Sequence, residues 1–125
     1  MKQIIVIRRK FDGRKVRTGK MIAQGAHASM AAILDRNPNG PSTLKNDPRI
    51  TQWLSVAFAK ITVYVDSEEE LLDIYQKATN AGLLTALIQD SGRTEFKGVK
   101  TYTAVAIGPD TAENVDPITG HLPLL

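Results

Sequence analysis

Hydrophobic and polar positions along the chain follow two different periods, which predict strands separated by helices. Residues 2–8 form an apolar run rich in Ile and Val, typical of a strand buried on both faces. The segments 59–66, 83–90 and 99–109 have the alternation or the composition of three further strands. The chain therefore carries enough strand-forming sequence for one four-stranded sheet.

The first helix is predicted from about residue 19 to residue 35, with Thr18 as its N-cap. Small residues dominate this segment, so we expect it to approach a sheet or another helix closely. The side chains predicted to face the core are Met21, Ile22, Gly25, Ala26, Ser29, Ala32 and Ile33.

Two further helices are predicted from their capping residues. Asp47 and Pro48 suit the N-cap and first positions of a short helix that continues to about residue 56, in which Trp53 packs against the body. Ser67 and Glu70 form a capping box at the start of a helix over 67–82.

The remaining segments are predicted to be connections. They are a basic loop at 9–17, a surface loop at 36–48, a turn at 91–98, a short helix at most at 110–116, and a terminal tail at 117–125. We find no repeat and no internal boundary. The sequence thus predicts a single α/β domain over residues 1–125, with a four-stranded mixed β-sheet flanked by helices in the order β-α-α-β-α-β-β-α.

Composition narrows the classes of function. The 125 residues include no cysteine, which excludes disulfides, thiolate zinc sites and a cysteine nucleophile. The absence of cysteine fits a protein of the reducing cytoplasm. No apolar run approaches the length of about 18 residues that a membrane span needs, so we expect no membrane partner.

Positive charge is concentrated at the start of the chain. Residues 1–20 hold eight of the sixteen Lys and Arg residues and one acid, a local charge of +7, whereas residues 21–125 carry −4. Such a patch suits a partner that bears phosphates. A solvated basic loop without a partner is the alternative.

A line of polar side chains interrupts the apolar first helix. At about 100° per residue, Lys20, Gln24 and His27 share one face. Gly19 and Lys20 at the helix start suit a phosphate or an oxyanion, although no Walker A motif is present, and an exposed first-turn lysine without a ligand is the alternative. His27 suits a general base, but a histidine that supports the core is the alternative. A metal site is not expected, because the other histidine, His121, lies in the tail.

Asp90 is the second candidate, because it ends a predicted strand where α/β folds place functional loops. Arg93 and Thr94 follow it with a cation and a hydroxyl. An ordinary Asp-Ser-Gly turn is the alternative interpretation.

The motifs GKMIAQGAHA (19–28), DSGRT (90–94), VAIGP (105–109) and VDPITGHLPLL (115–125) resemble those of the type 2 peptidyl-tRNA hydrolases, in the same order and over nearly the whole chain. The resemblance implies a mixed α/β fold, no cofactor, a homodimer, and hydrolysis of the ester between tRNA and a peptide or N-blocked amino acid. A non-catalytic RNA-binding or partner-binding relative of this fold is the alternative.

The resemblance also assigns residues. Lys20, Asp90 and Thr94 match the central polar residues of the family, Gln24 and His27 match those on its helix, and Thr103 matches a threonine on its last strand; the motif does not identify the general base. The residues expected to meet tRNA are basic: Arg8, Arg9, Lys10, Arg14, Lys15, Arg17 and Arg93.

Three departures from the family pattern are expected to affect substrate docking. The R-x-D-L sequence after the first strand is RRKF here, VAFAK replaces a Gly-Gln pair before the second strand, and the 36–46 loop is long.

Overall fold

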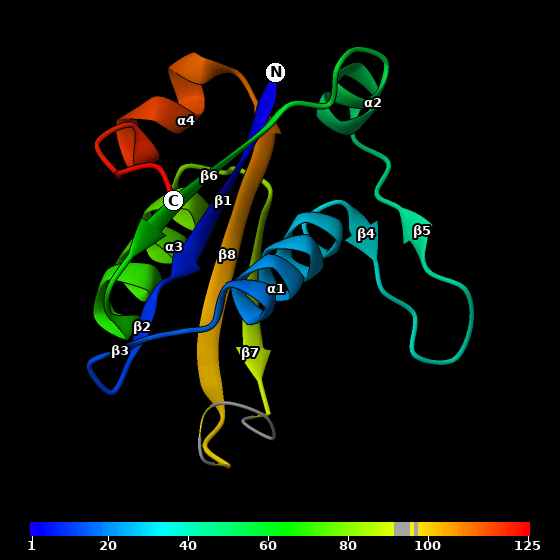
Figure 1. Ribbon diagram of the computed structural model, residues 1–125. Helices are drawn as coiled ribbons and strands as arrows, with labels where there is room; N and C mark the ends of the chain where they lie inside the picture. Colours follow the sequence, from blue (N-terminus) through cyan, green and yellow to red (C-terminus); the bar gives the residue numbers. More distant parts are fainter. Residues whose placement is uncertain (92–95, 97) are drawn as a thin grey trace.

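A four-stranded mixed sheet forms the centre of the computed structural model, which describes residues 1–91, 96 and 98–125 (Figure 1). The strand order is β6-β1-β8-β7. The central strand β1 pairs in parallel with β6 and antiparallel with β8, and β8 pairs antiparallel with β7. The predicted fold class and order of elements are confirmed. The bounds are β1 (Lys2–Arg8), β6 (Lys60–Val65), β7 (Thr85–Asp90) and β8 (Thr101–Asp110).

Helices cover both faces of the sheet. On one face lies α1 (Thr18–Ala31), and on the other lie α3 (Glu68–Asn80) and α4 (Ala112–Thr119) (Figure 1). Side chains alternate between the two faces of the sheet along β8: Ala104 and Ala106 face α1, whereas Val105 and Ile107 face α3. Within the described residues, no helix is long and apolar enough to cross a membrane.

The short helix α2 (Pro48–Leu54) caps one end of the sheet and is anchored by Trp53, which is 2% exposed. Two predicted caps are confirmed. Arg49 N donates to the Asp47 carboxylate at the start of α2, and Glu70 N donates to Ser67 Oγ at the start of α3.

Gly25 brings α1 close to the sheet. A Cβ atom at this position would lie only 3.3 Å from Ile7 Cδ1 and 3.4 Å from Ile5 Cγ2. These contacts are tight, so the lack of a side chain at Gly25 lets the helix lie close to β1 without displacing the two isoleucine side chains. The close approach predicted from the small residues is therefore observed, and it fixes the height of the helix above the strands.

Several details of α1 differ from the prediction. Arg17, rather than Thr18, is the N-cap residue, and it makes no side-chain capping bond. The helix ends at Ala31 because residues 34–35 form β4 (Leu34–Asp35), which pairs with β5 (Thr43–Leu44). Ile22 is 68% exposed and Ala26 is exposed too, since α1 packs on β1, β8 and β7 and leaves its flank toward the edge strand β6 open.

The basic loop at 9–17 contains a hairpin that was not predicted. Its strands are β2 (Lys10–Phe11) and β3 (Arg14–Lys15). Asp12 and Gly13 join them, both with positive φ, which is the conformation that a two-residue Asp-Gly hairpin turn requires. We refer to residues 10–15 as the basic hairpin.

The C-terminal segment is more ordered than predicted. The last helix is not confined to 110–116 but continues to Thr119, since Val115, Ile118 and Thr119 are buried. The tail then lies along the edge strand β6, where Tyr64 N donates to Pro123 O and Leu125 N donates to Thr62 O, both at 3.1 Å. A strand edge presents unpaired backbone groups, and the tail satisfies some of them.

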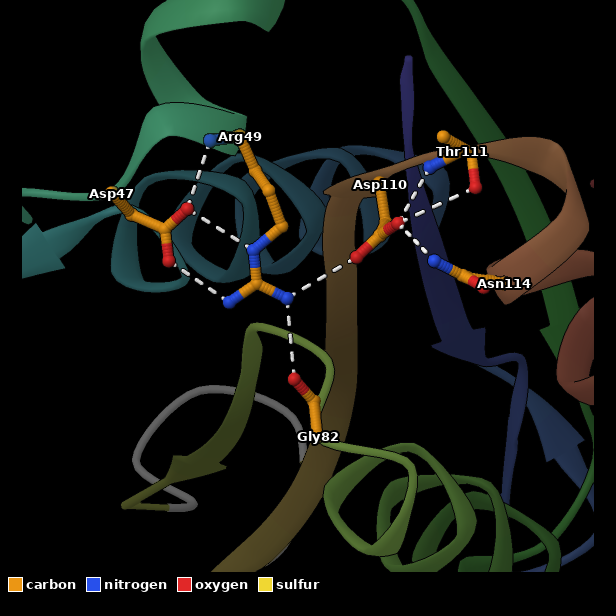
Figure 2. Close-up of polar contacts among 6 residues, drawn as sticks. All are labelled: Asp47, Arg49, Gly82, Asp110, Thr111 and Asn114. Atoms are coloured by element: carbon orange, nitrogen blue, oxygen red, sulfur yellow. Dashed lines mark hydrogen bonds and ion pairs between the residues drawn. The ribbon is translucent and has the colours of Figure 1, made fainter.

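A polar network joins α2, α4, the turn that follows α3 and the end of β8 (Figure 2). Arg49 forms ion pairs with Asp47 at 2.9 Å and with Asp110 at 3.2 Å, and donates to Gly82 O. Asn114 and the backbone N–H of Thr111 donate to the second oxygen of Asp110. These contacts tie α2 to the end of β8.

The network shifts the pKa of both carboxyls. The hydrogen bond from Arg49 lowers the pKa of Asp47. Burial raises the pKa of Asp110, but the hydrogen bonds from Asn114, Thr111 and Arg49 outweigh burial and leave that pKa lowered.

Candidate active site

Lys20 and Asp90 come from different layers and meet at one end of the sheet. Lys20 lies in the first turn of α1, and Asp90 is the last residue of β7. Lys20 Nζ is 2.7 Å from Asp90 Oδ2, and the side chains are only 17% and 12% exposed. Two groups this close can act on the same bond of a substrate.

Gln24 joins this pair from the next turn of α1. Its Nε2 donates to Asp90 Oδ2 at 3.2 Å, and its Oε1 accepts a hydrogen bond of 2.7 Å from Thr103 Oγ1. The hydroxyl bond sets the orientation of the amide, because only the NH₂ group can donate to the carboxylate. The result is a continuous chain of contacts from Thr103 through Gln24 to Asp90.

A register shift in the sheet places Thr103 beside Gln24. Ile88 pairs with Ala104, but Gln89 pairs with Tyr102, so Thr103 is the extra residue on β8. Tyr102 and Val105 pack in the core on the α3 face, while Ala104 packs under α1. Thr103 and Ala104 therefore both point toward α1, which simple alternation does not allow.

His27 does not join this group, although the helical wheel placed it on the same face. It is exposed and lines a separate hollow of about 370 Å³ with Ala23, Met30 and Arg36. Within the described residues, no hydrogen bond or ion pair links His27 to Lys20, Gln24 or Asp90. Arg93 and Thr94, which were also predicted to contribute, lie outside the described residues.

The sequence prediction did not include two aromatic residues beside the site. Phe96 is 2% exposed, and the centre of its ring lies 5.9 Å from Lys20 Nζ. Phe11 of β2 packs edge-on against it, with ring centres 4.9 Å apart. The signal available in the sequence was Phe96 itself, a single large apolar residue in the otherwise polar segment EFKG (95–98).

The basic residues divide into two groups. Arg8 and Arg9 are held within the protein, since Arg8 donates to Lys10 O and Arg9 makes two hydrogen bonds with Asp66 while its guanidinium lies 3.9 Å from the centre of the Tyr64 ring. The hydrogen bond with Asp66 raises the pKa of Arg9. The others are more accessible: Lys10 is half-buried, and Arg14, Lys15 and Arg17 are exposed.

The site combines a carboxylate, an ammonium and a fixed amide. A carboxylate can accept a proton from water, and an ammonium can stabilise an oxyanion, so the set suits hydrolysis of an ester. Over residues 1–91, 96 and 98–125, no three His, Cys, Asp or Glu side chains are grouped as metal ligands.

Comparison with known proteins identifies the family of the chain. The family model described as peptidyl-tRNA hydrolase PTH2 matches residues 1–125. The peptidyl-tRNA hydrolase of Methanocaldococcus jannaschii is 45% identical over 125 residues, covering 100% of both chains. Those of Sulfurisphaera tokodaii and Nanoarchaeum equitans are 40% and 38% identical over 124 residues, covering 99% of this chain and 98% of each relative. The chain belongs to the peptidyl-tRNA hydrolase PTH2 family.

Proposed function

We propose that the protein hydrolyses peptidyl-tRNA, splitting the ester between the peptide or N-blocked amino acid and the tRNA. Membership of the family and the names of its relatives support this reaction. The observation that carries the assignment of residues is the ion pair of 2.7 Å between Lys20 and Asp90. We refer to these two residues as the catalytic pair.

In the proposed mechanism, Asp90 removes a proton from a water molecule while the oxygen of that water attacks the ester carbonyl carbon. Negative charge develops on the carbonyl oxygen, where the Lys20 ammonium stabilises it. The bond between the carbonyl carbon and the ribose oxygen then breaks, and the ribose oxygen takes up the proton. The products are free tRNA and a peptide with a free carboxyl group.

Gln24 and Thr103 act through Asp90 in this mechanism. Gln24 donates to the same carboxylate oxygen as Lys20, and Thr103 holds the amide in place. They are therefore positioning residues that limit the rotation of the carboxylate. Thr94 is proposed to position the water or the terminal ribose, and His27 to contact RNA from the hollow on α1.

The tRNA backbone is proposed to lie against the basic hairpin and the start of α1. Lys10, Arg14, Lys15 and Arg17 are the accessible cations there, and Arg93 is proposed to add another. Contacts with phosphates give an affinity that depends on salt and little on sequence. Arg8 and Arg9 contribute positive potential, although their hydrogen bonds hold them in the protein.

The test is hydrolysis of N-acetyl-aminoacyl-tRNA by the purified protein and by Lys20→Ala and Asp90→Asn. We expect each substitution to reduce kcat by about a hundredfold or more, because each removes a group that meets the reacting atoms. Lys77→Ala is the control, since Lys77 pairs with Asp73 on exposed positions of α3. An inactive parent protein would contradict the function, and full activity of both variants would contradict the assigned residues.

The same experiment addresses the non-catalytic alternative. A protein that only binds RNA would retain tRNA in a salt-dependent manner without releasing the peptide. Esters with a free α-amine, tested in parallel, show whether the substrate must be N-blocked.

A homodimer in the cytoplasm is proposed as the working form. An apolar hollow of about 260 Å³ between α1 and β6, lined by Ile22, Thr62 and Leu125 among others, supports a protein contact. Sedimentation of the parent and of Ile22→Glu tests it, because a charge in a buried contact would shift the protein toward the monomer. A parent protein that sediments as a monomer at micromolar concentration would contradict the dimer.

A further inference from the structure

Phe96 lies beside the catalytic pair, but the proposed mechanism gives it no role. Its side chain is 2% exposed, although Phe96 belongs to the connection between β7 and β8. Connections normally run over the surface, so a fully buried ring in one calls for an explanation. We propose that Phe96, braced by Phe11, is a positioning residue that fixes Lys20 and couples it to the basic hairpin; this inference rests on the proposed function.

The ring of Phe96 bounds the space available to the lysine ammonium. Lys20 Nζ lies 2.7 Å from Asp90 Oδ2 on one side and 5.9 Å from the centre of the ring on another. A lysine has four rotatable bonds and reaches many positions unless neighbouring groups exclude them. The ring attracts the cation weakly at this distance, so its main effect is to keep the ammonium beside the carboxylate.

The position of the ring is itself fixed by packing. Phe96 belongs to the apolar cluster beneath α1, together with Val16 and Met21. Met21 is the residue next to Lys20, and Val16 directly follows the basic hairpin. The cluster thus joins the connection after Asp90, the first turn of α1 and the base of the hairpin.

Phe11 provides the direct link to the basic hairpin. It ends β2, and its ring meets Phe96 edge-on at 4.9 Å with an angle of 62° between the ring planes. Arg8 lies over Phe11, with its guanidinium carbon 5.5 Å from the ring centre. An edge-on aromatic pair has a preferred geometry, so a movement of the hairpin is transmitted to Phe96.

The consequence for the reaction is a coupling of binding and chemistry. The cations of the hairpin meet the tRNA backbone, while the two rings connect the hairpin to Lys20. Contacts with tRNA on the hairpin therefore help to hold the ammonium at the developing oxyanion. Loss of either ring reduces the rate of the chemical step more than it reduces the affinity for tRNA.

The experiment compares Phe96→Leu, Phe11→Leu and the double variant with the parent. Leucine retains an apolar side chain but removes the ring. We expect Phe96→Leu to lower the single-turnover rate on N-acetyl-aminoacyl-tRNA about tenfold, because a small displacement of a reacting group is costly. We expect the Kd for deacylated tRNA to stay within about twofold of the parent value. Phe11→Leu should give a smaller loss of the same kind.

The double variant separates coupling from two independent defects. If Phe11 acts through Phe96, the double variant should be about as slow as Phe96→Leu alone, since the two substitutions then remove the same interaction. Effects on the rate that simply multiply would overturn the coupling.

A control variant separates positioning from loss of stability. Ile74→Val removes a methyl group from the core on the opposite face of the sheet, away from Lys20 and Phe11. We expect it to lower the melting temperature while the single-turnover rate measured below that temperature stays at the parent value. Should Phe96→Leu fail to fold, Phe11→Leu, whose side chain is half-buried, carries the test.

Three results would overturn the inference in an active parent protein. They are a parental rate in folded Phe96→Leu, a parental rate in Phe11→Leu, and a loss of rate in Ile74→Val that matches its loss of stability. An inactive parent protein is a different outcome, because it contradicts the proposed function itself.

Discussion

At the scale of single residues, the site depends on the side-chain amide of Gln24, which is hydrogen-bonded at both its oxygen and its nitrogen. Thr103 donates to Gln24 Oε1, and Gln24 Nε2 donates to Asp90. Thr103 is 5% exposed, so water cannot readily replace a lost partner. The amide satisfies a buried hydroxyl, which serves stability, and in the proposed mechanism it also orients the carboxylate of Asp90.

The variant Gln24→Leu separates these two roles. We expect it to lower the free energy of unfolding by about 1–3 kcal/mol, because the buried hydroxyl of Thr103 loses its acceptor. We also expect kcat to fall about tenfold, since Asp90 loses a group that orients it. Urea unfolding and hydrolysis of N-acetyl-aminoacyl-tRNA measure the two effects.

Gln24→Leu combined with Thr103→Val is the matched control for stability. Replacing both partners of a hydrogen bond by apolar groups costs little, so the double variant should recover most of the stability. Its kcat should remain low, because Asp90 still lacks the amide. A kcat that recovers together with stability would show that Gln24 has no positioning role.

Three residues show how much of the site could be inferred from the sequence. Lys20 and Gln24 are four positions apart on a helix, so their common face follows from helical geometry alone. Thr103 was assigned by resemblance only, since strict alternation on β8 would turn it toward α3 with Val105 and Ile107. Its observed direction results from the register shift between β7 and β8, which the sequence pattern does not reveal.

At the scale of elements, α2 depends on contacts outside itself. It has only seven residues, which is too short for a helix to be stable alone. Trp53 anchors one side, and Arg49 bridges Asp47 and Asp110 on the other (Figure 2). The side chain of Asp110 is 6% exposed, so the charge of Arg49 compensates a buried carboxylate.

Arg49→Ala should lower the free energy of unfolding at pH 7 by about 2 kcal/mol, because Asp110 loses its cation while keeping its contacts with Asn114 and Thr111. Urea unfolding measures this loss. Arg36→Ala, an exposed arginine in the connection before α2, is the control and should change stability by less than about 0.5 kcal/mol. Equal stability of the two variants would contradict a supporting role for the network.

The same variant tests how stability depends on pH. The pKa values of Asp47 and Asp110 are lowered below 3.8 in the folded protein, so the unfolded chain takes up protons first as the pH falls. Their contribution is complete above about pH 5, begins to fall as the pH nears the value for the unfolded chain, and is lost as the pH drops through the folded values. Arg49→Ala should therefore lose less stability than the parent between pH 5 and pH 3. Parallel pH profiles for parent and variant would contradict this assignment.

Elements that are fixed by contacts between residues close in the sequence could be predicted, whereas those fixed by contacts between distant segments could not. The starts of α2 and α3 were predicted because their caps lie within three residues of the bonds that they make. The exposure of Ile22 was not predicted, since the helical pattern does not show which strands lie beneath α1. The pairing of the tail with β6 was missed for the same reason, because it joins residues about sixty positions apart.

At the scale of the whole molecule, the separation of charge is the feature most relevant to tRNA. The first 20 residues carry +7 and the remainder −4, and the fold gathers exposed cations in the basic hairpin and at the start of α1. Figure 1 shows this region near the end of the sheet at which β7 terminates. A polyanion drawn to this region would therefore arrive beside Lys20 and Asp90.

The double variant Arg14→Ala/Lys15→Ala should weaken tRNA binding and reduce its dependence on salt. Each phosphate contact contributes about 0.7–0.9 to the slope of log K against log salt, so losing two should reduce the slope by about 1.5. Binding of deacylated tRNA at several salt concentrations measures it, with Lys77→Ala as a control on the opposite face of the sheet. An unchanged slope would place the tRNA backbone elsewhere. A reduced slope with an unchanged kcat at saturating substrate would show that these two cations bind the tRNA, but it would contradict the proposed coupling between tRNA contacts on the hairpin and the position of Lys20.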